Sequence, residues 1–395
     1  MPTLDYDLVI AGGGLAGLLA AREAASKGLS VAILEEDMEI GLPDKCDGLV
    51  SMKALMTLGV IPSSKAMQNS IRRVLLYPPS GKPLEVEASK LKIVVLNRSV
   101  FDKDLARAAS SKGAEIILGE RVAKAVEEEE YVKVEANHTF KSRLYIEAKG
   151  ISALPDDKQR SLIPAARYDI EAKWIEESTI EIYVDSNKYP SFFLWVIPTG
   201  KDSAKVGVGG RSINCFATLD KFLKEKGGGH VIKKVSAPIY VGGPIDNFVK
   251  GRMITVGDSA GQTKPSTGGG IYSCGVAGIL AGQAAARHLI DEDTDALQEY
   301  ARSWLNLFKE DFKTILQARR VFEKLDNRSI EKVFNLIREK NLVNEILQED
   351  GFDEHSKWIK RFLNIEDFVK IFSIVAAEEI RSLLRQIGSF WMRRR

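Results

Sequence analysis

Residues 6–35 of this 395-residue chain read YDLVIAGGGLAGLLAAREAASKGLSVAILE. Residues 6–11 are a short apolar run, which is typical of a buried strand. Leu and Ala follow at helical spacing until Gly28, a residue type that commonly ends helices. Residues 30–34 return to a strand pattern. The stretch therefore predicts a strand–helix–strand unit that opens a Rossmann-type fold.

Three glycines at the first turn, Gly12, Gly14 and Gly17, follow the G-x-G-x-x-G spacing. The first allows a tight turn, the second lets a pyrophosphate approach the backbone, and the third lets the helix pack closely on the strand. The helix N-terminus offers N–H donors to phosphates. Glu35 ends the next strand, where a carboxylate accepts hydrogen bonds from a ribose and repels the 2′-phosphate of NADP. We expect a dinucleotide site; a glycine-rich turn without a ligand is the alternative.

A second glycine-rich turn lies more than 200 residues further along the chain, from Gly257 to the start of a helix at Ile271. NAD needs no second turn, whereas FAD has a long far half that does. Asp258 is placed to hold the ribityl hydroxyls of FAD. Three N–H groups are placed to face the pyrimidine edge of its isoalloxazine ring, those of Gly268, Gly269 and Gly270. The predicted cofactor is therefore FAD.

The second turn also contains Gly257-x-Ser259-x-Gly261, the nucleophile-elbow pattern of α/β-hydrolases. This alternative would take its histidine from His288 or His355. It predicts a colourless protein, and it leaves the first glycine turn unexplained.

The sequence pattern changes at residue 169, after which polar and apolar residues alternate, as expected for an antiparallel sheet with one covered face. From residue 291 the chain is mostly helical and charged. We predict an α/β protein (α+β overall) with three parts. These are a Rossmann-type FAD-binding domain of residues 1–168 and 250–290, an inserted antiparallel-sheet substrate domain of residues 169–249, and a C-terminal helical region of residues 291–395.

The composition excludes several classes of function. Hydrophobic residues make up 45% and charged residues 28%, which indicates a globular protein, and the net charge of +2 is too small for nucleic-acid binding. The histidines and cysteines show no metal-ligand spacing, so we expect no metal. No apolar run reaches the ~20 residues of a membrane span, and no signal peptide pattern occurs, so we expect a cytoplasmic protein. The basic end, residues 391–395, allows peripheral contact with an anionic membrane; a solvated helical cap is the alternative.

With both glycine turns in place, residues 5–290 resemble the para-hydroxybenzoate-hydroxylase-like flavoproteins. Within that group the chain is most similar to the geranylgeranyl reductases, which saturate isoprenoid chains of archaeal ether lipids and chlorophyll precursors. Residues 45–49 (KCDGL) and 190–198 (PSFFLWVIP) carry this closer resemblance, because the second segment matches the reductases' aromatic-x-Trp-x-x-Pro pattern. The chain departs from the superfamily at Lys149 and Leu154, where an acid and an arginine are common. This departure weakens a hydroxylase interpretation.

The resemblance implies a set of residues around FAD. They are Gly12, Gly14, Ala16, Gly17, Glu35, Glu36, Lys45, Cys46, Arg98, Val122, Gly257, Asp258, Gly268, Gly269, Gly270 and Ile271. It also implies that Cys46 lies near the flavin ring as a catalytic thiol, although small cysteines are common in cores. Four residues would line a lipid groove, with ordinary strand core as the alternative: Phe192, Phe193, Trp195 and Pro198.

The implied reaction is saturation of carbon–carbon double bonds in geranylgeranyl chains of a lipid precursor. A hydride from reduced flavin would reach one carbon and a proton the other. The electron donor stays open between NAD(P)H and ferredoxin, because the sequence has no second G-x-G-x-x-G. Two alternatives within the fold are an FAD monooxygenase of the aromatic hydroxylase type, which uses NAD(P)H and oxygen, and a non-redox flavoprotein such as a cyclase.

Overall fold

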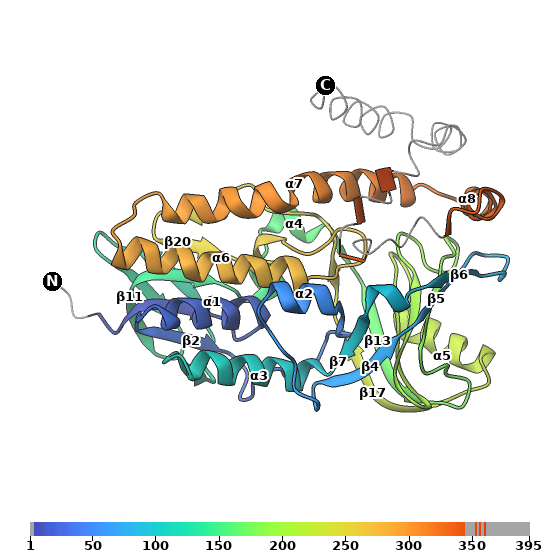
Figure 1. Ribbon diagram of the computed structural model, residues 1–395, viewed down its shortest axis with the longest axis horizontal. Helices are drawn as coiled ribbons and strands as arrows, with labels where there is room; N and C mark the ends of the chain where they lie inside the picture. The colour runs from blue at the N-terminus through green and yellow to red at the C-terminus, as the bar shows by residue number, and fades with distance from the viewer. Residues whose placement is uncertain (1–3, 344–351, 354, 357–358, 361–395) are drawn as a thin grey trace, which may run out of the picture.

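The computed structural model describes residues 4–343, 352–353, 355–356 and 359–360. Two units, each built on a sheet, lie side by side, and α7 runs from the first towards the second (Figure 1). The basic end considered for membrane contact lies outside the described residues. Within them, no helix combines the length and apolar character needed to cross a membrane.

The first unit contains an eight-stranded sheet of the described residues, in the order β19-β20-β11-β1-β2-β8, with β10 and β9 following on from β11. β1 pairs in parallel with β2 and β11, and β11 with β20, as in a Rossmann-type sheet. The strands are β1 (Tyr6–Ala11), β2 (Val31–Glu35), β8 (Glu115–Leu118), β9 (Lys124–Glu127), β10 (Val132–Glu135), β11 (Thr139–Glu147), β19 (Val249–Lys250) and β20 (Met253–Thr255).

Alternation along β1 defines the two faces of this sheet. Leu8 and Ile10 are buried with the helices, whereas Val9 and Ala11 are buried with β10 on the other face. On the helical face, α1 packs against both α3 and α6, and α6 packs against α7 (Figure 1). These helices are α1 (Leu15–Ser26), α3 (Arg98–Ser110), α6 (Ile271–Ile290) and α7 (Ala296–Phe322). The predicted strand–helix–strand unit and the helix at 271–290 are confirmed.

Helix α3 begins at Arg98, directly after Asn97. The reason is the cap at Asn97, whose side chain accepts the N–H of Val100. An Asn at this position satisfies a donor that would otherwise be left unpaired, and so extends the helix backwards. Arg98 is thus a helical residue of the first turn.

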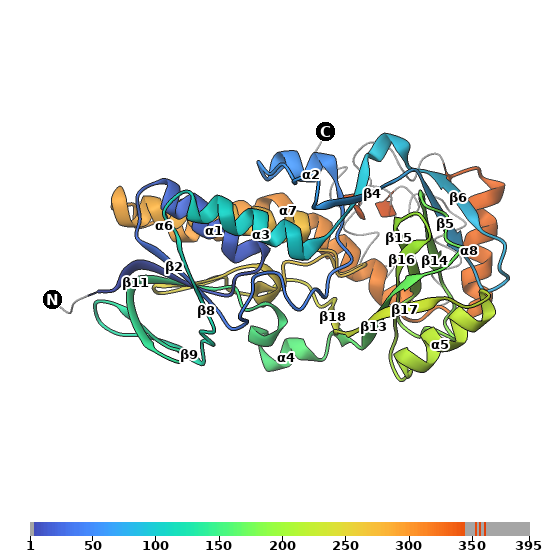
Figure 2. The ribbon, with the colours of Figure 1, turned by 90° about the horizontal axis from the view of Figure 1, so that it is seen from below.

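The second unit is a seven-stranded sheet of the described residues, in the order β17-β13-β16-β15-β14-β5-β6. The pairs are antiparallel except β14–β5. Helix α5 (Cys215–Glu225) covers one face, which is visible below the strands in Figure 2. The strands are β5 (Arg73–Tyr77), β6 (Leu84–Glu87), β13 (Ala165–Glu171), β14 (Thr179–Tyr183), β15 (Leu194–Gly200), β16 (Ser203–Gly209) and β17 (His230–Ser236).

The predicted antiparallel sheet is present, and the overall fold class is confirmed. Strands β5 and β6 come from residues 73–87, where the sequence analysis assigned no element. Their partner across the parallel pair is β14, about 100 residues later in the chain, with Thr179 opposite Arg73. The domain boundaries stay a prediction.

Shorter elements connect the two units. A three-stranded sheet, in the order β3-β7-β4, contacts β15 of the second unit, and β12 pairs with β18. The strands are β3 (Leu49–Ser51), β4 (Met67–Ile71), β7 (Ile93–Leu96), β12 (Leu162–Ile163) and β18 (Ile239–Tyr240), and the remaining helices are α2 (Met52–Thr57), α4 (Asp156–Gln159) and α8 (Asn327–Glu339).

Candidate active site

The first glycine turn has the geometry of a diphosphate cradle. Gly12 lies in the left-handed region, with φ of +106°, and a Cβ there would lie 2.4 Å from the carbonyl oxygen of Ala148. A Cβ on Gly17 would lie 2.1 Å from the Gly12 oxygen, so α1 packs closely on the turn. Gly14 precedes α1, and a Cβ there would meet nothing within 4 Å. The open space in front of Gly14, at a helix N-terminus, fits the diphosphate of FAD.

Glu35 closes the edge of this cradle. Its Oε2 accepts the N–H of Gly13 at 2.6 Å, and its Oε1 accepts the N–H of Asp37 at 3.0 Å. The carboxylate is thereby held at the end of β2, beside the turn. This is the position from which a ribose contact was predicted, and the contact itself stays a prediction.

Two other predicted cofactor residues lie near this end of the sheet. Glu36 is exposed and pairs with Arg121 at 3.3 Å. Val122 is buried, and its carbonyl accepts a hydrogen bond from Lys149 Nζ at 3.2 Å. Lys149, which stands where superfamily members carry an acid, therefore supports the backbone at Val122.

The second glycine turn lies directly against the first turn of α1, as the sequence analysis predicted. A Cβ on Gly257 would lie 3.0 Å from the Cβ of Ala16. Further along α6, a Cβ on Gly278 would lie 2.3 Å from the Ala16 carbonyl oxygen, so the two helices pack with little side chain between them. Segments more than 200 residues apart thus form one elongated site, as a dinucleotide with two distant ends requires.

Asp258 and Gly270 lie together where this second turn enters α6. Asp258 Oδ1 accepts a hydrogen bond from the Cys274 thiol at 3.5 Å, and a Cβ on Gly270 would lie 3.6 Å from the same oxygen. Burial raises the pKa of the Asp258 carboxyl, while the Cys274 thiol and the charge of Arg98 act in the opposite direction. Ile271 is the buried first residue of α6.

The last glycines before α6 have different environments. Gly268 has φ of +72°, and a Cβ there would lie 2.2 Å from a methyl of Ile239. Gly269 is half-buried, and its carbonyl accepts the N–H of Lys264. The hydrogen bond from Lys264 to Gly269 closes the loop before α6. A residue with a side chain would not fit at Gly268.

The hydrolase interpretation of this turn is wrong. Ser259 is fully buried, and its hydroxyl donates to the carbonyl of Gly150 at 2.9 Å. His288 Nδ1 lies against the Asp293 carbonyl and His355 Nδ1 against the Ser266 hydroxyl. A nucleophilic serine must be exposed and paired with a histidine, and Ser259 meets neither condition.

Cys46 lies in a loop that faces the start of α3. Its sulfur accepts the N–H of Gly48 at 3.4 Å. Arg98 makes a two-point contact with Asp102, at 3.1 and 3.0 Å. Burial lowers the pKa of the Arg98 guanidinium, but the charge of Asp102 and its hydrogen bonds outweigh this effect and raise the pKa. The charge of Arg98 also lowers the pKa of the Asp258 carboxyl, against the larger effect of burial.

Lys45 is exposed, next to Cys46 in the same loop. Its contact with FAD stays a prediction. The sequence analysis also overlooked two buried cations behind this loop, Arg167 and Lys205, which donate to its backbone carbonyls. No local sequence signal marked them, because β13 and β16 also carry other polar residues and burial is visible only in the structure.

The predicted substrate segment packs its aromatic rings onto glycines of the neighbouring strand. A Cβ on Gly207 would lie 2.2 Å from the Trp195 ring, and a Cβ on Gly209 would lie 2.7 Å from the Phe192 ring. Phe192 also stacks on Phe193, with ring centroids 4.2 Å apart. The glycine pair of β16 therefore provides the space that these rings occupy. Pro198 is buried at the far end of β15.

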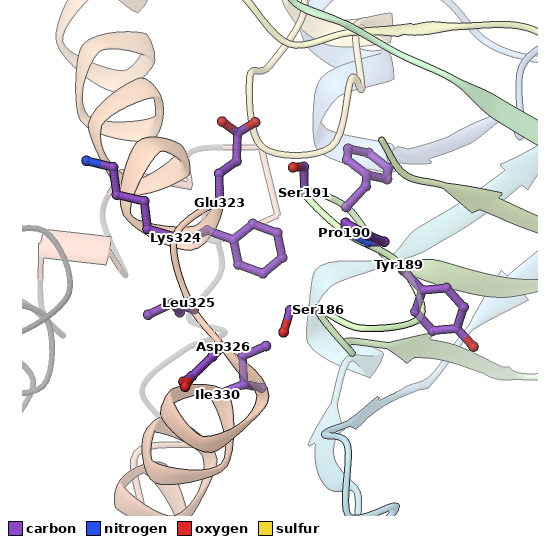
Figure 3. A pocket seen from close by; sticks show the side chains of 11 residues that line it. Ser186, Tyr189, Pro190, Ser191, Glu323, Lys324, Leu325, Asp326 and Ile330 are labelled. Atoms are coloured by element: carbon purple, nitrogen blue, oxygen red, sulfur yellow. The ribbon is translucent and has the colours of Figure 1, made fainter. Parts of the chain in front are cut away.

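A cavity of about 270 Å³ borders this segment. It lies between the 186–192 loop and the junction of α7 with α8, whose side chains face each other across it in Figure 3. Its apolar lining includes Tyr189, Phe192, Phe322, Leu325 and Ile330. One residue of the predicted groove, Phe192, thus lies at a cavity.

Metal ligands do not gather in the described part of the chain, where no group of three or more His, Cys, Asp or Glu side chains could hold a metal ion. The candidate site therefore depends on the glycine turns, the Cys46 loop and the aromatic segment.

Comparisons with known proteins agree with this site. The model of the FAD-dependent oxidoreductase family matches residues 7–154, and together with the two converging turns this defines the class: the protein is an FAD-dependent oxidoreductase. Within that class the chain belongs to the digeranylgeranylglycerophospholipid reductase family. It is 30% identical to digeranylgeranylglycerophospholipid reductase 1 of Methanopyrus kandleri, over 90% of this chain and 100% of that relative. Reductase 2 of the same organism is 29% identical, over 93% and 99%.

Solved structures share the fold. A geranylgeranyl bacteriochlorophyll reductase-like protein from Thermoplasma acidophilum superimposes with a TM-score of 0.82 at 22% identity, over 96% of this chain and 99% of that one. The p-nitrophenol 4-monooxygenase of Pseudomonas putida superimposes with a TM-score of 0.66 at 17% identity, over 94% and 99%. At these identities the likeness concerns the fold alone.

Proposed function

We propose that this protein saturates carbon–carbon double bonds in the geranylgeranyl chains of an ether-lipid precursor. The names of its relatives support this substrate class. The observation that carries the proposal is the contact of the two glycine turns, where a Cβ on Gly257 would lie 3.0 Å from the Cβ of Ala16. When bound and reduced, FAD supplies the hydride that adds to one alkene carbon.

Cys46 would supply the proton for the other carbon. An isolated alkene has no carbonyl to polarise, so the reaction depends on a positioned acid and on the exclusion of water. The contact with Gly48 directs the Cys46 sulfur within its loop, and Arg98, itself held by Asp102, lies beside it. In this role Cys46 donates its S–H proton and must be reprotonated before the next turnover.

The aromatic segment would hold the isoprenoid chain and keep water away. Phe192 and Trp195 are buried, and Phe192 lines a cavity together with the apolar side chains of Phe322, Leu325 and Ile330 and with charged residues of the junction between α7 and α8. The apolar part of this lining would contact the hydrocarbon chain.

Electrons would come from a transient donor, NAD(P)H or ferredoxin. Their source stays a prediction, as does peripheral contact with a membrane. The sequence analysis found one G-x-G-x-x-G, and FAD is expected to occupy it, so a nicotinamide would have to dock without a second Rossmann unit.

A direct assay tests the proposed reaction. The purified protein, loaded with FAD and reduced under nitrogen, is mixed with a geranylgeranyl ether lipid. Mass spectrometry should find products that have gained two hydrogens per reduced bond. The monooxygenase alternative predicts instead oxygen uptake with NAD(P)H and an unchanged lipid. A protein that turns over with no net electron consumption would point to the cyclase alternative.

A further inference from the structure

The backbone of the Cys46 loop is held by cations from the second sheet: the buried Arg167 and Lys205, and the half-buried Lys233 on β17, which donates to the Asp44 carbonyl at 3.4 Å. Arg167 on β13 donates through Nη1 to the carbonyl of Cys46 at 2.9 Å, and through Nη2 to that of Asp44 at 3.2 Å. Lys205 on β16 donates to the carbonyls of Cys46 at 3.1 Å and Asp47 at 3.2 Å. Both cations are only 3% exposed. The Cys46 carbonyl therefore receives two charge-assisted hydrogen bonds from one side.

The same face of the sheet carries the predicted substrate segment. In the antiparallel register, Arg167 lies opposite Gly207, and Gly207 lies opposite Trp195. Directly opposed residues share a face, so these three form one row across β13, β16 and β15. Lys205 is two residues before Gly207 and lies on that face too. The surface on which the Trp195 ring rests is thus the surface that holds the Cys46 loop.

Burying charged side chains costs desolvation free energy. The two cations are balanced by carboxylates: Arg167 Nε lies 2.9 Å from Asp169 and Nη1 3.5 Å from Asp47, and Lys205 Nζ lies 3.9 Å from Asp44. Apolar packing of similar volume commonly stabilises a core as well or better. What the cations add is direction, because each donor fixes where a particular carbonyl lies.

We propose that Arg167 and Lys205 are positioning residues for Cys46, which fix its thiol relative to a substrate held against Trp195. The inference rests on the proposed role of Cys46 as proton donor. Neither cation touches the reacting atoms in this scheme. They act through the loop backbone, so that the sheet that binds the lipid also sets the place of the acid.

Alkylation of Cys46 tests the positioning without any turnover. The FAD-loaded protein is treated with iodoacetamide, and modification of the Cys46 peptide is followed by mass spectrometry. We expect Arg167→Met and Lys205→Met to increase the alkylation rate about tenfold, because loss of charge-assisted bonds loosens the loop. The matched control is Lys234→Met on β17, whose ammonium lies over the Tyr168 ring at 4.9 Å, on the face of the sheet opposite to Arg167. Its rate should stay within about twofold of wild type.

Turnover supplies the second measurement. In both variants kcat should fall about tenfold or more while KM for the lipid changes little and the visible spectrum still shows bound FAD. Lys205→Arg, which keeps a donor, should recover part of kcat. If Arg167→Met does not fold, the charge-balanced pair Arg167→Met with Asp169→Asn replaces it. Unchanged alkylation in the Met variants, or a change equal to that of Lys234→Met, would overturn the proposal. If the wild type reduces no lipid, the proposed function fails, and alkylation still decides the positioning.

Discussion

The turn at residues 12–17 and the loop at residues 44–47 serve one site but are held in different ways. The turn is shaped by backbone contact: Gly12 against Ala148, and Gly17 against Gly12. The loop is held by side chains from strands more than 100 residues later, Arg167 and Lys205. The cofactor end of the site is therefore held within the first sheet and its helices, whereas the reacting end exists only when both sheets are in place.

The largest effect should come from filling the turn. In Gly14→Val the new side chain points into open space, so the protein should fold but lose FAD, and with it all activity. The purified variant should be colourless, with a melting temperature close to that of wild-type apoprotein. Gly17→Val is the contrast, because its side chain meets the Gly12 oxygen; it should lose FAD and at least ~3 kcal/mol of stability as well. If the Gly14→Val protein were yellow, it would still bind FAD, and the turn at Gly14 would not be the diphosphate site.

A smaller effect should come from the loop. Cys46→Ser should keep FAD and lower kcat by roughly 10²–10⁴-fold, the range for loss of a general acid. Cys215→Ser is the matched control, since that thiol lies at the start of α5 and contacts the Pro164 carbonyl. Steady-state assays of lipid reduction separate the two. Equal rates for wild type and Cys46→Ser would remove the thiol from the mechanism and leave the loop a structural element.

The smallest effect should appear at the second glycine turn. Because burial raises the pKa of Asp258 in the folded protein, its ionised form at neutral pH destabilises the fold, and the penalty fades as the pH falls towards the unfolded value of about 4. Asp258→Asn apoprotein should therefore melt above wild type at pH 7, with a difference that narrows at acidic pH. It should also bind FAD more weakly. A lower melting temperature than wild type at pH 7 would show that Asp258 stabilises the fold instead of straining it.

Much of the cofactor end could be predicted from the sequence, because its determinants are short. The spacing of Gly12, Gly14 and Gly17 predicts the turn, and the structure confirms it. The second turn predicts FAD, and the match to the FAD-dependent oxidoreductase family confirms this cofactor. The contact of the second turn with Ala16 agrees with this prediction, because FAD must reach from one turn to the other. Individual cofactor contacts stay predictions.

The substrate end was harder to predict. Arg167 and Lys205 looked like ordinary polar positions of alternating strands, and no local pattern tells a buried cation from a solvated one. Gly207 and Gly209 leave room for the Trp195 and Phe192 rings, and this role depends on strand register. Register is a tertiary property that one sequence does not reveal.

The route of the chain through the second sheet has a consequence for biosynthesis. β5 emerges from the ribosome about 100 residues before its parallel partner β14, and the pairing of Arg73 with Thr179 must wait for the later strand. Until then β5 and β6 form a lone hairpin with an open edge, which is marginally stable by itself. The nascent chain thus holds an unfinished sheet while α3 and β8 to β11 of the first unit are synthesised, and closure of such distant pairs is a slow step in folding.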